Sequence, residues 1–485
     1  MLVRERLFQA YGDLPWPFQD ISPRTAILSA VLTFALYFLT ASFYNVFLHP
    51  LRNVPGPLLA KIRYGDEVKC FNIYILWRIH KAFTATETFA LKEAHDRYGR
   101  VIRTGPNELS FGSPTALRKI YTQGKGAPLK TGFYSEAIPF KEQHTFSMVD
   151  KRMHLGRKKL VSKCFSPAHL ARFVQGVEQL SVHLNNLLAA RTKETTDNVL
   201  DVYHVLNMFT FEAVYLLSFE EPLGMIESGN EHVLMHWMEE TTASLIIAVL
   251  VPLARKTFYR MPGAWADKYR AVHKTKKYYA ERMRERQKPG GSEFLHQLLN
   301  TPSDEHNRPL NDSEASEELI GLLFAGSETV GVSMTWLLWE LARNPDVQEK
   351  LYEEIREVAP SLSSPVDHNA VVNLPYLKAV INETLRIHTA ILGPFPRIAV
   401  EDMAIEGQAV PKGTVVTMCT YVTHRDPAYF PNPEVWDPER WISGDLETMK
   451  KAFAPFSVGP RTCVGQALAM TELTTLAPAL VSMFY

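Results

Sequence analysis

One cysteine stands in a pattern that can support redox chemistry. In the segment FSVGPRTCVG, Phe456, Gly459, Arg461, Cys463 and Gly465 have the spacing F-x-x-G-x-R-x-C-x-G. A cysteine thiolate can be the axial ligand of haem iron and push electron density toward O–O cleavage. A helix that begins just after Cys463 would direct its free N–H groups at the sulfur and stabilise the thiolate. The alternative is a buried free cysteine after a glycine turn, but five fixed positions favour the metal ligand.

The neighbours of Cys463 have roles that suit a flat macrocycle. Gly459 permits a tight turn, and Gly465 lets the backbone approach the macrocycle closely. Arg461 can pair with a haem propionate, and Phe456 would pack beside the thiolate. The motif therefore predicts Cys463 as the metal ligand and Phe456, Arg461 and Gly465 as cofactor-binding residues.

This cysteine motif resembles that of the cytochrome P-450 haem-thiolate superfamily, and the segment AGSET at 325–329 carries the same resemblance. Taken alone, a threonine beside a glutamate in a helix is usually unremarkable. The family has an A-G-x-[DE]-T oxygen-activation motif, so the resemblance implies that Glu328 and Thr329 are the catalytic pair that delivers protons. Gly326 would leave space above the cofactor. Thr329 can divert its hydroxyl to a backbone carbonyl and open the helix locally.

A glutamate and two arginines form a second pattern. Glu383 and Arg386 have i, i+3 spacing, which places them on one face of a helix, although most such pairs are solvated surface bridges. The resemblance implies a third member, Arg440 in the segment PERW, where the family more often has Phe in place of Trp441. The implied role of this triad is structural, to lock the loop network behind the haem.

Several cations match positions at which the family contacts haem propionates. The segment 151–163 contains six Lys or Arg residues and no acid, and its simplest interpretation is a solvated basic face. Within it, His154 and Lys158 fit the family's pair of a Trp or His and, four residues on, an Arg or Lys. Arg397, which follows GPFP at 393–396, matches another propionate position. The remaining cations predict a docking patch for an acidic electron donor.

The elements that must position these residues follow from hydrophobic periodicity. Helical period predicts helices at 79–98, 115–122, 153–164, 167–190, 202–218, 232–248, 264–286, 314–343, 345–357 and 375–388. Short strand-like segments lie at 101–103, 108–111, 399–405 and 414–418. The pattern predicts a mainly α (α+β) fold with small β-sheets and one catalytic domain.

The N-terminal part predicts a membrane anchor. Residues 25–48 carry no charge and would form a helix about 36 Å long, enough to cross a hydrocarbon core of about 30 Å. A cleaved signal peptide would have a shorter apolar core nearer the N-terminus and a small-residue cleavage site. The expected division is an N-terminal segment (1–24), a transmembrane helix (25–48), a proline-rich hinge (49–57) and a haem-thiolate catalytic domain (58–485).

Three further segments leave alternatives open. The apolar run 244–253 is either a buried helix end or a loop that dips into the membrane surface. The segment 64–75 is either a genuine insertion or an error in the gene product. Family members normally continue for several tens of residues beyond the helix that contains Tyr485, so we expect the C-terminus to be truncated. The charges that flank the anchor give only a weak indication of its orientation.

Composition excludes some classes of function. The 52 Lys and Arg residues balance the 52 Asp and Glu residues, so no global basic field favours nucleic acid. The four cysteines are far apart, with no C-x-x-C pair, which disfavours a structural zinc site and a disulfide framework.

The resemblance implies a haem b monooxygenase that oxidises a small, lipophilic substrate and lies in the endoplasmic reticulum membrane, with its catalytic domain in the cytosol. Electrons would come from NADPH through a separate FMN- and FAD-containing reductase. The sequence style resembles filamentous-fungal members, which tailor secondary metabolites or oxidise small aromatics and lipids. By family position, the substrate would contact Leu322, Phe324, Ala325, Ile391, Leu392 and Phe395. The alternatives are a truncated, non-catalytic haem-binding protein and a haem-thiolate isomerase or dehydratase, against which the Glu328–Thr329 pair argues.

Overall fold

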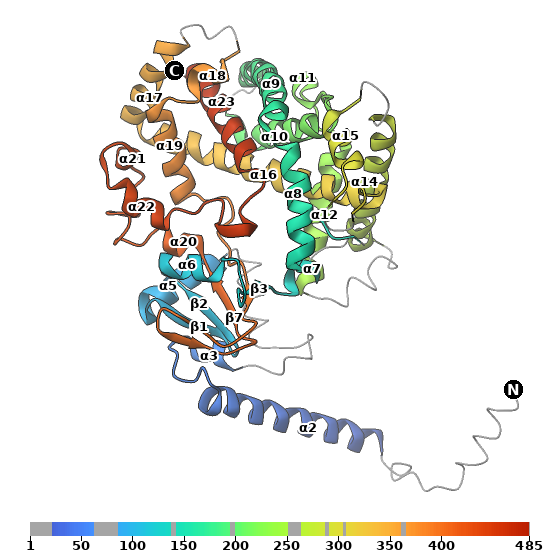
Figure 1. The fold of residues 1–485 in the computed structure, drawn as a ribbon, viewed down its shortest axis with the longest axis vertical. Helices are drawn as coiled ribbons and strands as arrows, with labels where there is room; N and C mark the ends of the chain where they lie inside the picture. The colour runs from blue at the N-terminus through green and yellow to red at the C-terminus, as the bar shows by residue number, and fades with distance from the viewer. Residues whose placement is uncertain are drawn as a thin grey trace, which may run out of the picture.

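The computed structural model describes residues 22–62, 86–136, 142–194, 199–250, 263–286, 291–303, 307–359 and 365–484. Helices make up most of the molecule, a small sheet lies at one end of the helical body, and one helix extends away from it (Figure 1). The structure thus confirms the predicted mainly helical class with small sheets. The segment 64–75 and most of the run 79–86 lie outside the described residues.

The helical body is built from long helices that enclose one large apolar core. These are α8 (Lys151–Cys164), α9 (Pro167–Glu194), α10 (Val202–Phe219), α12 (Val233–Leu250), α14 (Ala264–Arg286), α15 (Glu293–Asn300), α16 (Asp312–Arg343), α17 (Pro345–Val358), α19 (Pro375–Ile387) and α23 (Gln466–Phe484). Shorter helices are α3 (Leu58–Lys61), α5 (Glu87–Tyr98), α6 (Pro114–Ile120), α7 (Phe133–Glu136), α11 (Met225–Ser228), α18 (His368–Val371), α20 (Thr420–Thr423), α21 (Arg440–Ser443), α22 (Leu446–Ala452) and the 3₁₀ turn η3 (Gly459–Arg461).

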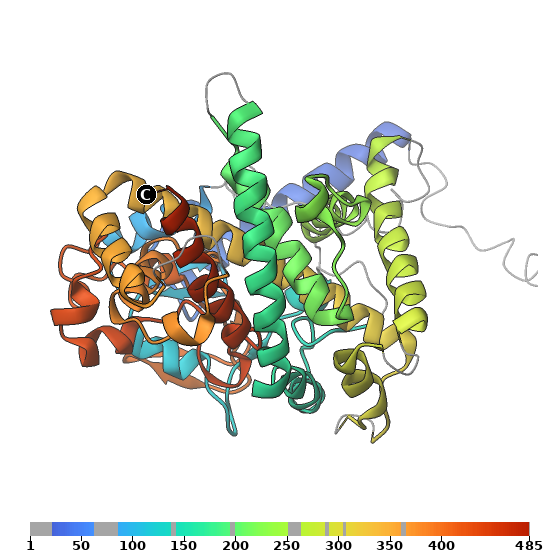
Figure 2. The ribbon, with the colours of Figure 1, turned by 90° about the horizontal axis from the view of Figure 1, so that it is seen from above.

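Helix α16 crosses the body next to α10, as Figures 1 and 2 show from two directions. It begins with a capping box, in which the side chains of Asn311 and Glu314 each accept a hydrogen bond from the other residue's N–H. Gly326 allows close approach of the two helices, because a side chain there would lie 2.8 Å from Val214 Cγ2 on α10. Thr210 of α10 donates to the carbonyl of Ser327 at 2.7 Å. α16 is therefore fixed along the part that carries the AGSET motif.

The main sheet has five strands in the order β1-β2-β7-β4-β3, and a separate hairpin pairs β5 with β6. The strands are β1 (Val101–Gly105), β2 (Glu108–Phe111), β3 (Leu129–Lys130), β4 (Arg397–Ile398), β5 (Met403–Ile405), β6 (Gln408–Val410) and β7 (Val415–Met418). The strand predicted at 399–405 is wrong as one element, since only its last three residues form a strand, β5, and β4 ends before it at Ile398. The pairing of β3 with β4 places Lys130 opposite Arg397.

The apolar N-terminal helix runs from Pro23 to Leu48, as α2 (Pro23–Phe43) followed by a π-helical turn η1 (Tyr44–Leu48). Its mean hydropathy is 2.0 and none of it is buried in the protein, so it is a candidate membrane span. Helices α10 and α16 are also long and apolar enough to span, but 78% and 44% of their apolar windows are buried in the body. α2 extends away from the body (Figure 1).

The segment predicted as a hinge packs on the sheet. Leu51 and Val54 are buried with residues of β2, β7 and α6. Arg103 of β1 is fully buried, donates its backbone N–H to the carbonyl of Pro55 at 2.7 Å, and donates from its guanidinium to the carbonyl of Asn45 at 2.9 Å. The end of the apolar helix is therefore attached to the catalytic body by a side chain of the sheet.

Candidate functional site

Cys463 lies in a tight loop between η3 and α23. The loop is closed by a hydrogen bond from Cys463 N to the carbonyl of Phe456 at 3.0 Å. Gly459 has φ +75°, and a side chain there would lie 1.9 Å from the carbonyl oxygen of Tyr121, so the turn requires glycine. Helix α23 begins at Gln466, three residues beyond the cysteine, which confirms the predicted helix.

The surroundings of the thiol distinguish Cys463 from the other described cysteines. Cys463 is exposed, whereas Cys164 and Cys419 are buried, and burial raises the pKa of both buried thiols to about 12. Surrounding protein also raises the pKa of the Cys463 thiol, but the N–H of Gly465 and the cation of Lys158 lower it. Cys463 is thus the accessible thiol among the three, and it has two groups that stabilise its thiolate.

A pocket rich in cations lies beside this loop, between α8, β3, β4 and η3. Its volume is about 30 Å³. Five basic side chains line it, and no Asp or Glu is among its lining residues; the five are Lys130, Lys151, His154, Arg397 and Arg461.

The pocket gathers basic side chains whose charged forms the surrounding protein disfavours. Burial and the neighbouring cations lower the pKa of Lys130 to about 6 and that of His154 to about 3. Burial and Arg397 lower the pKa of Arg461 to about 10. His154 Nδ1 is buried and has no hydrogen-bond partner. Without an anion, Lys130 and His154 are therefore mostly neutral at pH 7, and a bound anion would favour their charged forms; the two carboxylates of a haem are chemically suitable. The residues present therefore fit haem.

The other predicted cofactor residues lie around this pocket. Lys158 Nζ donates to the carbonyls of Pro460 and Thr462, at 3.0 and 2.7 Å, so it ties α8 to the cysteine loop and is not among the residues that line the pocket. The guanidinium of Arg461 donates to the carbonyl of Met148 at 2.8 Å.

Arg397 on β4 is held by a tyrosine that the motifs did not indicate. Its guanidinium donates to Tyr134 Oη at 2.8 Å and lies 5.4 Å from the centre of that ring.

Lys130 is the pocket residue that sequence reasoning missed. Its ammonium lies 4.3 Å from the ring centre of Tyr134 and 4.7 Å from that of Phe146, and it donates to the carbonyl of Phe146. It reaches the pocket only because β3 pairs with β4. A lone lysine before a glycine-containing turn carries no motif, so the sequence held no signal for it.

On α16 the predicted catalytic neighbours face different surroundings. Thr329 Oγ1 donates to the carbonyl of Ala325 at 2.8 Å, the local bond that the sequence predicted. Glu328 instead lines a small cavity between α10, α12 and α16. Burial and the charge of Glu239 raise its pKa. Gly326 turns its free face toward Val214 on α10, so the structure gives it a packing role, and its role toward the cofactor stays a prediction.

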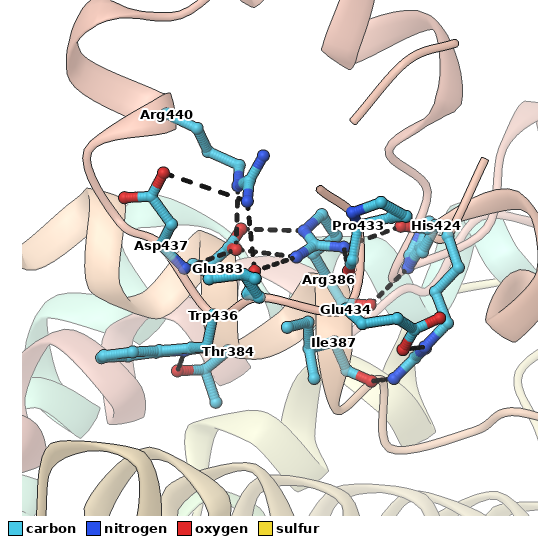
Figure 3. A network of polar contacts seen from close by, with 12 residues as sticks. Glu383, Thr384, Arg386, Ile387, His424, Pro433, Glu434, Trp436, Asp437 and Arg440 are labelled. Atoms are coloured by element: carbon cyan, nitrogen blue, oxygen red, sulfur yellow. Dashed lines mark hydrogen bonds and ion pairs between the residues drawn. The ribbon is translucent and has the colours of Figure 1, made fainter. Parts of the chain in front are cut away.

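The three residues Glu383, Arg386 and Arg440 meet in one buried network (Figure 3). Arg386 donates to both carboxylate oxygens of Glu383, at 2.7 and 2.9 Å, and Arg440 Nε donates to Glu383 Oε1 at 2.9 Å. The indole N–H of Trp441 and the backbone N–H of Asp437 also donate to this carboxylate, each at 2.9 Å. The charge of Glu383 is therefore fully hydrogen-bonded.

His424 lies beside this network (Figure 3) and connects it to the segment before the cysteine loop. Its Nε2 accepts from the backbone N–H of Ala454 at 2.9 Å, so the proton lies on Nδ1, which donates to the carbonyl of Arg386 at 3.0 Å. Burial lowers the pKa of His424 to about 3, which keeps it neutral and preserves this tautomer. The arrangement joins α19 to the start of the segment that leads to Cys463.

A helix-rich fold, an accessible thiol before a helix N-terminus and a cation-lined pocket are together the features of a haem-thiolate oxidoreductase. The family model described as Cytochrome P450 matches residues 69–485. The chain therefore belongs to the cytochrome P450 family, whose cofactor is haem, and it is a monooxygenase-class oxidoreductase.

The similar curated proteins are fungal. Cytochrome P450 monooxygenase ORF9 of Penicillium roqueforti is 30% identical over 455 residues, covering 91% of this chain and 84% of the relative. Tryprostatin B 6-hydroxylase of Neosartorya fischeri is 27% identical over 494 residues, covering 98% and 84%. Cytochrome P450 monooxygenase atr2 of Stereocaulon alpinum is 30% identical over 467 residues, covering 92% and 87%.

Proposed function

We propose that this chain inserts one oxygen atom from O₂ into a small lipophilic substrate of fungal secondary metabolism. The observation that carries the proposal is the accessible thiol of Cys463 before α23, beside a buried cationic pocket. The hydroxylase and monooxygenase names of its relatives support it. Among them, tryprostatin B 6-hydroxylase indicates a class of small-molecule substrate without defining the one used here.

In this proposal, Cys463 is the metal ligand, and Gly465 and Lys158 stabilise its thiolate. Lys130, His154, Arg397 and Arg461 hold the propionates, since they line the pocket between α8, the sheet and the cysteine loop. Phe456 packs between this loop and the main core. Haem, when bound, supplies the redox chemistry and the activation of O₂.

The chain's own contribution to the reaction is proton delivery and exclusion of water. Thr329 holds its hydroxyl proton toward the carbonyl of Ala325 and can release it by rotation about χ1. Glu328, whose pKa is raised, is a proton reservoir one residue away. Because Glu328 faces the cavity between α10, α12 and α16, its proton reaches Thr329 through a change of rotamer or a water.

Electrons come from NADPH through a flavoprotein reductase that docks on the exposed cations of α8. Arg152, Lys159 and Lys163 are exposed on this helix. Arg157 does not belong to the patch, because it is buried and paired with Glu318 at 3.1 Å. We propose that Pro23–Leu48 anchors the chain in the endoplasmic reticulum membrane with the catalytic body in the cytosol.

The test is the ferrous–carbon monoxide difference spectrum of microsomes that express the full chain, followed by reductase-dependent NADPH oxidation. A red-shifted Soret band that is lost in Cys463→Ser and kept in Cys419→Ser supports the proposed ligand. Thr329→Ala should divert oxygen reduction from product to hydrogen peroxide. Thr335→Ala is the matched control, since Thr335 makes the same hydroxyl-to-carbonyl bond on α16 at 2.8 Å.

Two outcomes would contradict the proposal. A band at the same position in Cys463→Ser would reject Cys463 as the ligand. Product formation without NADPH or reductase would instead support an isomerase or dehydratase.

A further inference from the structure

A small cavity separates Glu328 from the protein surface. Residues of three helices line it: Asn207 and Phe211 of α10, Met235, Met238, Glu239 and Thr242 of α12, and Phe324, Ser327 and Glu328 of α16. Their spacings are those of single helix faces, so the cavity is built by the helix packing itself. Its volume is about 10 Å³, which is about the size of one water molecule.

The residues that line this cavity include a buried acceptor without a hydrogen-bond partner. Asn207 is 93% buried, since its exposed fraction is 7%, and its Oδ1 has no hydrogen-bond partner. Two carboxylates, Glu239 and Glu328, line the same cavity. The two hydroxyls in its lining are used elsewhere, because Ser327 donates to the carbonyl of Leu323 and Thr242 to that of Met238. One water molecule in the cavity would supply the donor that Asn207 Oδ1 lacks.

The charges around the cavity are negative. Burial and the charge of Glu239, on α12, raise the pKa of Glu328. Burial also raises the pKa of Tyr203, on α10, and so do the charges of three acidic residues, Glu328, Glu239 and Asp201. The adjacent Glu240 is paired with Lys268 at 2.9 Å and does not line the cavity. Glu239 is exposed whereas Glu328 is half-buried, so the two carboxyl groups form a path from solvent to the interior.

We propose that Glu239 is the surface residue through which protons reach Glu328, across one water molecule held by Asn207. The O–H bond of a protonated Glu239 breaks, its proton passes to the water, and the water gives another of its protons to the carboxylate of Glu328. Solvent then returns a proton to Glu239. No electrons move, and the water is regenerated. This relay rests on the proposed proton-delivery role of Glu328.

The test compares Glu239→Gln, Glu328→Gln and the matched control Glu240→Gln in the haem-loaded full chain with its reductase. Hydrogen peroxide released per NADPH and the D₂O solvent isotope effect on NADPH oxidation are both measured, so no substrate is required. We expect Glu239→Gln to raise both severalfold, Glu239→Asp to restore them in part, and Glu240→Gln to leave them unchanged. Glu239→Gln combined with Glu328→Gln should be no worse than Glu328→Gln alone, because both act on one path.

A second readout does not depend on turnover. The pH at which the infrared carboxyl band of Glu328 titrates, with the band identified by its loss in Glu328→Gln, should be lower in Glu239→Gln, since loss of the neighbouring negative charge lowers the pKa of Glu328. If Glu328→Gln changes peroxide release while Glu239→Gln matches Glu240→Gln in every readout, the relay is wrong and the role of Glu328 stands. If Glu328→Gln itself has no effect, the proposed proton delivery fails first.

Discussion

Replacing Glu383 by glutamine tests whether the buried triad stabilises the fold. The carboxylate accepts five hydrogen bonds: two from Arg386, and one each from Arg440, Trp441 and the backbone of Asp437. Glu383 and Arg386 are fully buried. Glutamine has nearly the same shape, but it directs an NH₂ group at donors, leaves Arg386 without a counter-charge and leaves Arg440 with only Asp437, at 4.0 Å.

The expected loss is large because it leaves buried charge uncompensated. Removing one partner of a buried ion pair destabilises a protein by about 3–5 kcal/mol, a sizeable part of the roughly 5–15 kcal/mol by which a domain is stable. The matched control is Glu447→Gln, since the side chain of Glu447 is 88% exposed and pairs with Lys451 at 3.4 Å. An exposed pair of this kind contributes at most about 1 kcal/mol.

Urea unfolding followed by far-ultraviolet circular dichroism measures the difference, because the helices that the triad joins unfold with the body. We expect a clearly lower urea midpoint for Glu383→Gln and an almost unchanged one for Glu447→Gln. Where Glu383→Gln does not accumulate, Arg386→Lys keeps the charge, loses most of the bonds and should unfold at an intermediate midpoint. Equal midpoints for Glu383→Gln and Glu447→Gln would refute the reasoning.

Three further predictions concern other buried groups. Burial raises the pKa of Glu472 well above its usual 4.5, so the folded chain binds this proton more tightly than the unfolded chain, and the free energy of unfolding falls as pH rises above about 4.5. Glu472→Gln should therefore be more stable than the unsubstituted chain at pH 8, and its urea midpoint should depend less on pH. An unchanged slope of urea midpoint against pH would contradict this. Gly326→Ala should cost about 1–3 kcal/mol by contact with Val214, and Val214→Ala should restore the midpoint. Arg103→Met removes the guanidinium that donates to the carbonyl of Asn45. It should speed proteolysis between residues 49 and 57 while the spectrum of the ferrous–carbon monoxide complex is kept, and equal cleavage rates would rule out the attachment.

The long helices could be predicted because each has a persistent apolar face. The helix predicted at 264–286, for example, is α14 (Ala264–Arg286). The strand predicted at 399–405 failed because Glu401 and Asp402 interrupt the apolar alternation there, and Asp402 accepts a turn hydrogen bond from Lys412 N at 2.8 Å. Local pattern therefore identifies elements that bury a face along their whole length, and it fails where a turn is set by a distant partner.

The candidate site divides in the same way. The cysteine loop, the α16 motif and the triad could be found because their spacing is local or matches a known family. Lys130 and Glu239 could not, since each acquires its neighbours only when segments far apart in the chain pack together. The sequence also could not show that Glu328 and Thr329 face different surroundings, because that depends on how α10 and α12 pack on α16.

The chain treats its two sets of buried cations in opposite ways. In the triad, the carboxylates of Glu383 and Asp437 balance the charges of Arg386 and Arg440, so the network is complete within the protein. In the pocket, Lys130 and its neighbours have no acidic partner in the lining, which by itself destabilises the fold. An anion that binds only the folded chain must therefore stabilise it by linkage. Because Lys158 ties the same region to the cysteine loop, we infer that ligation by Cys463 and neutralisation of the pocket are coupled to folding.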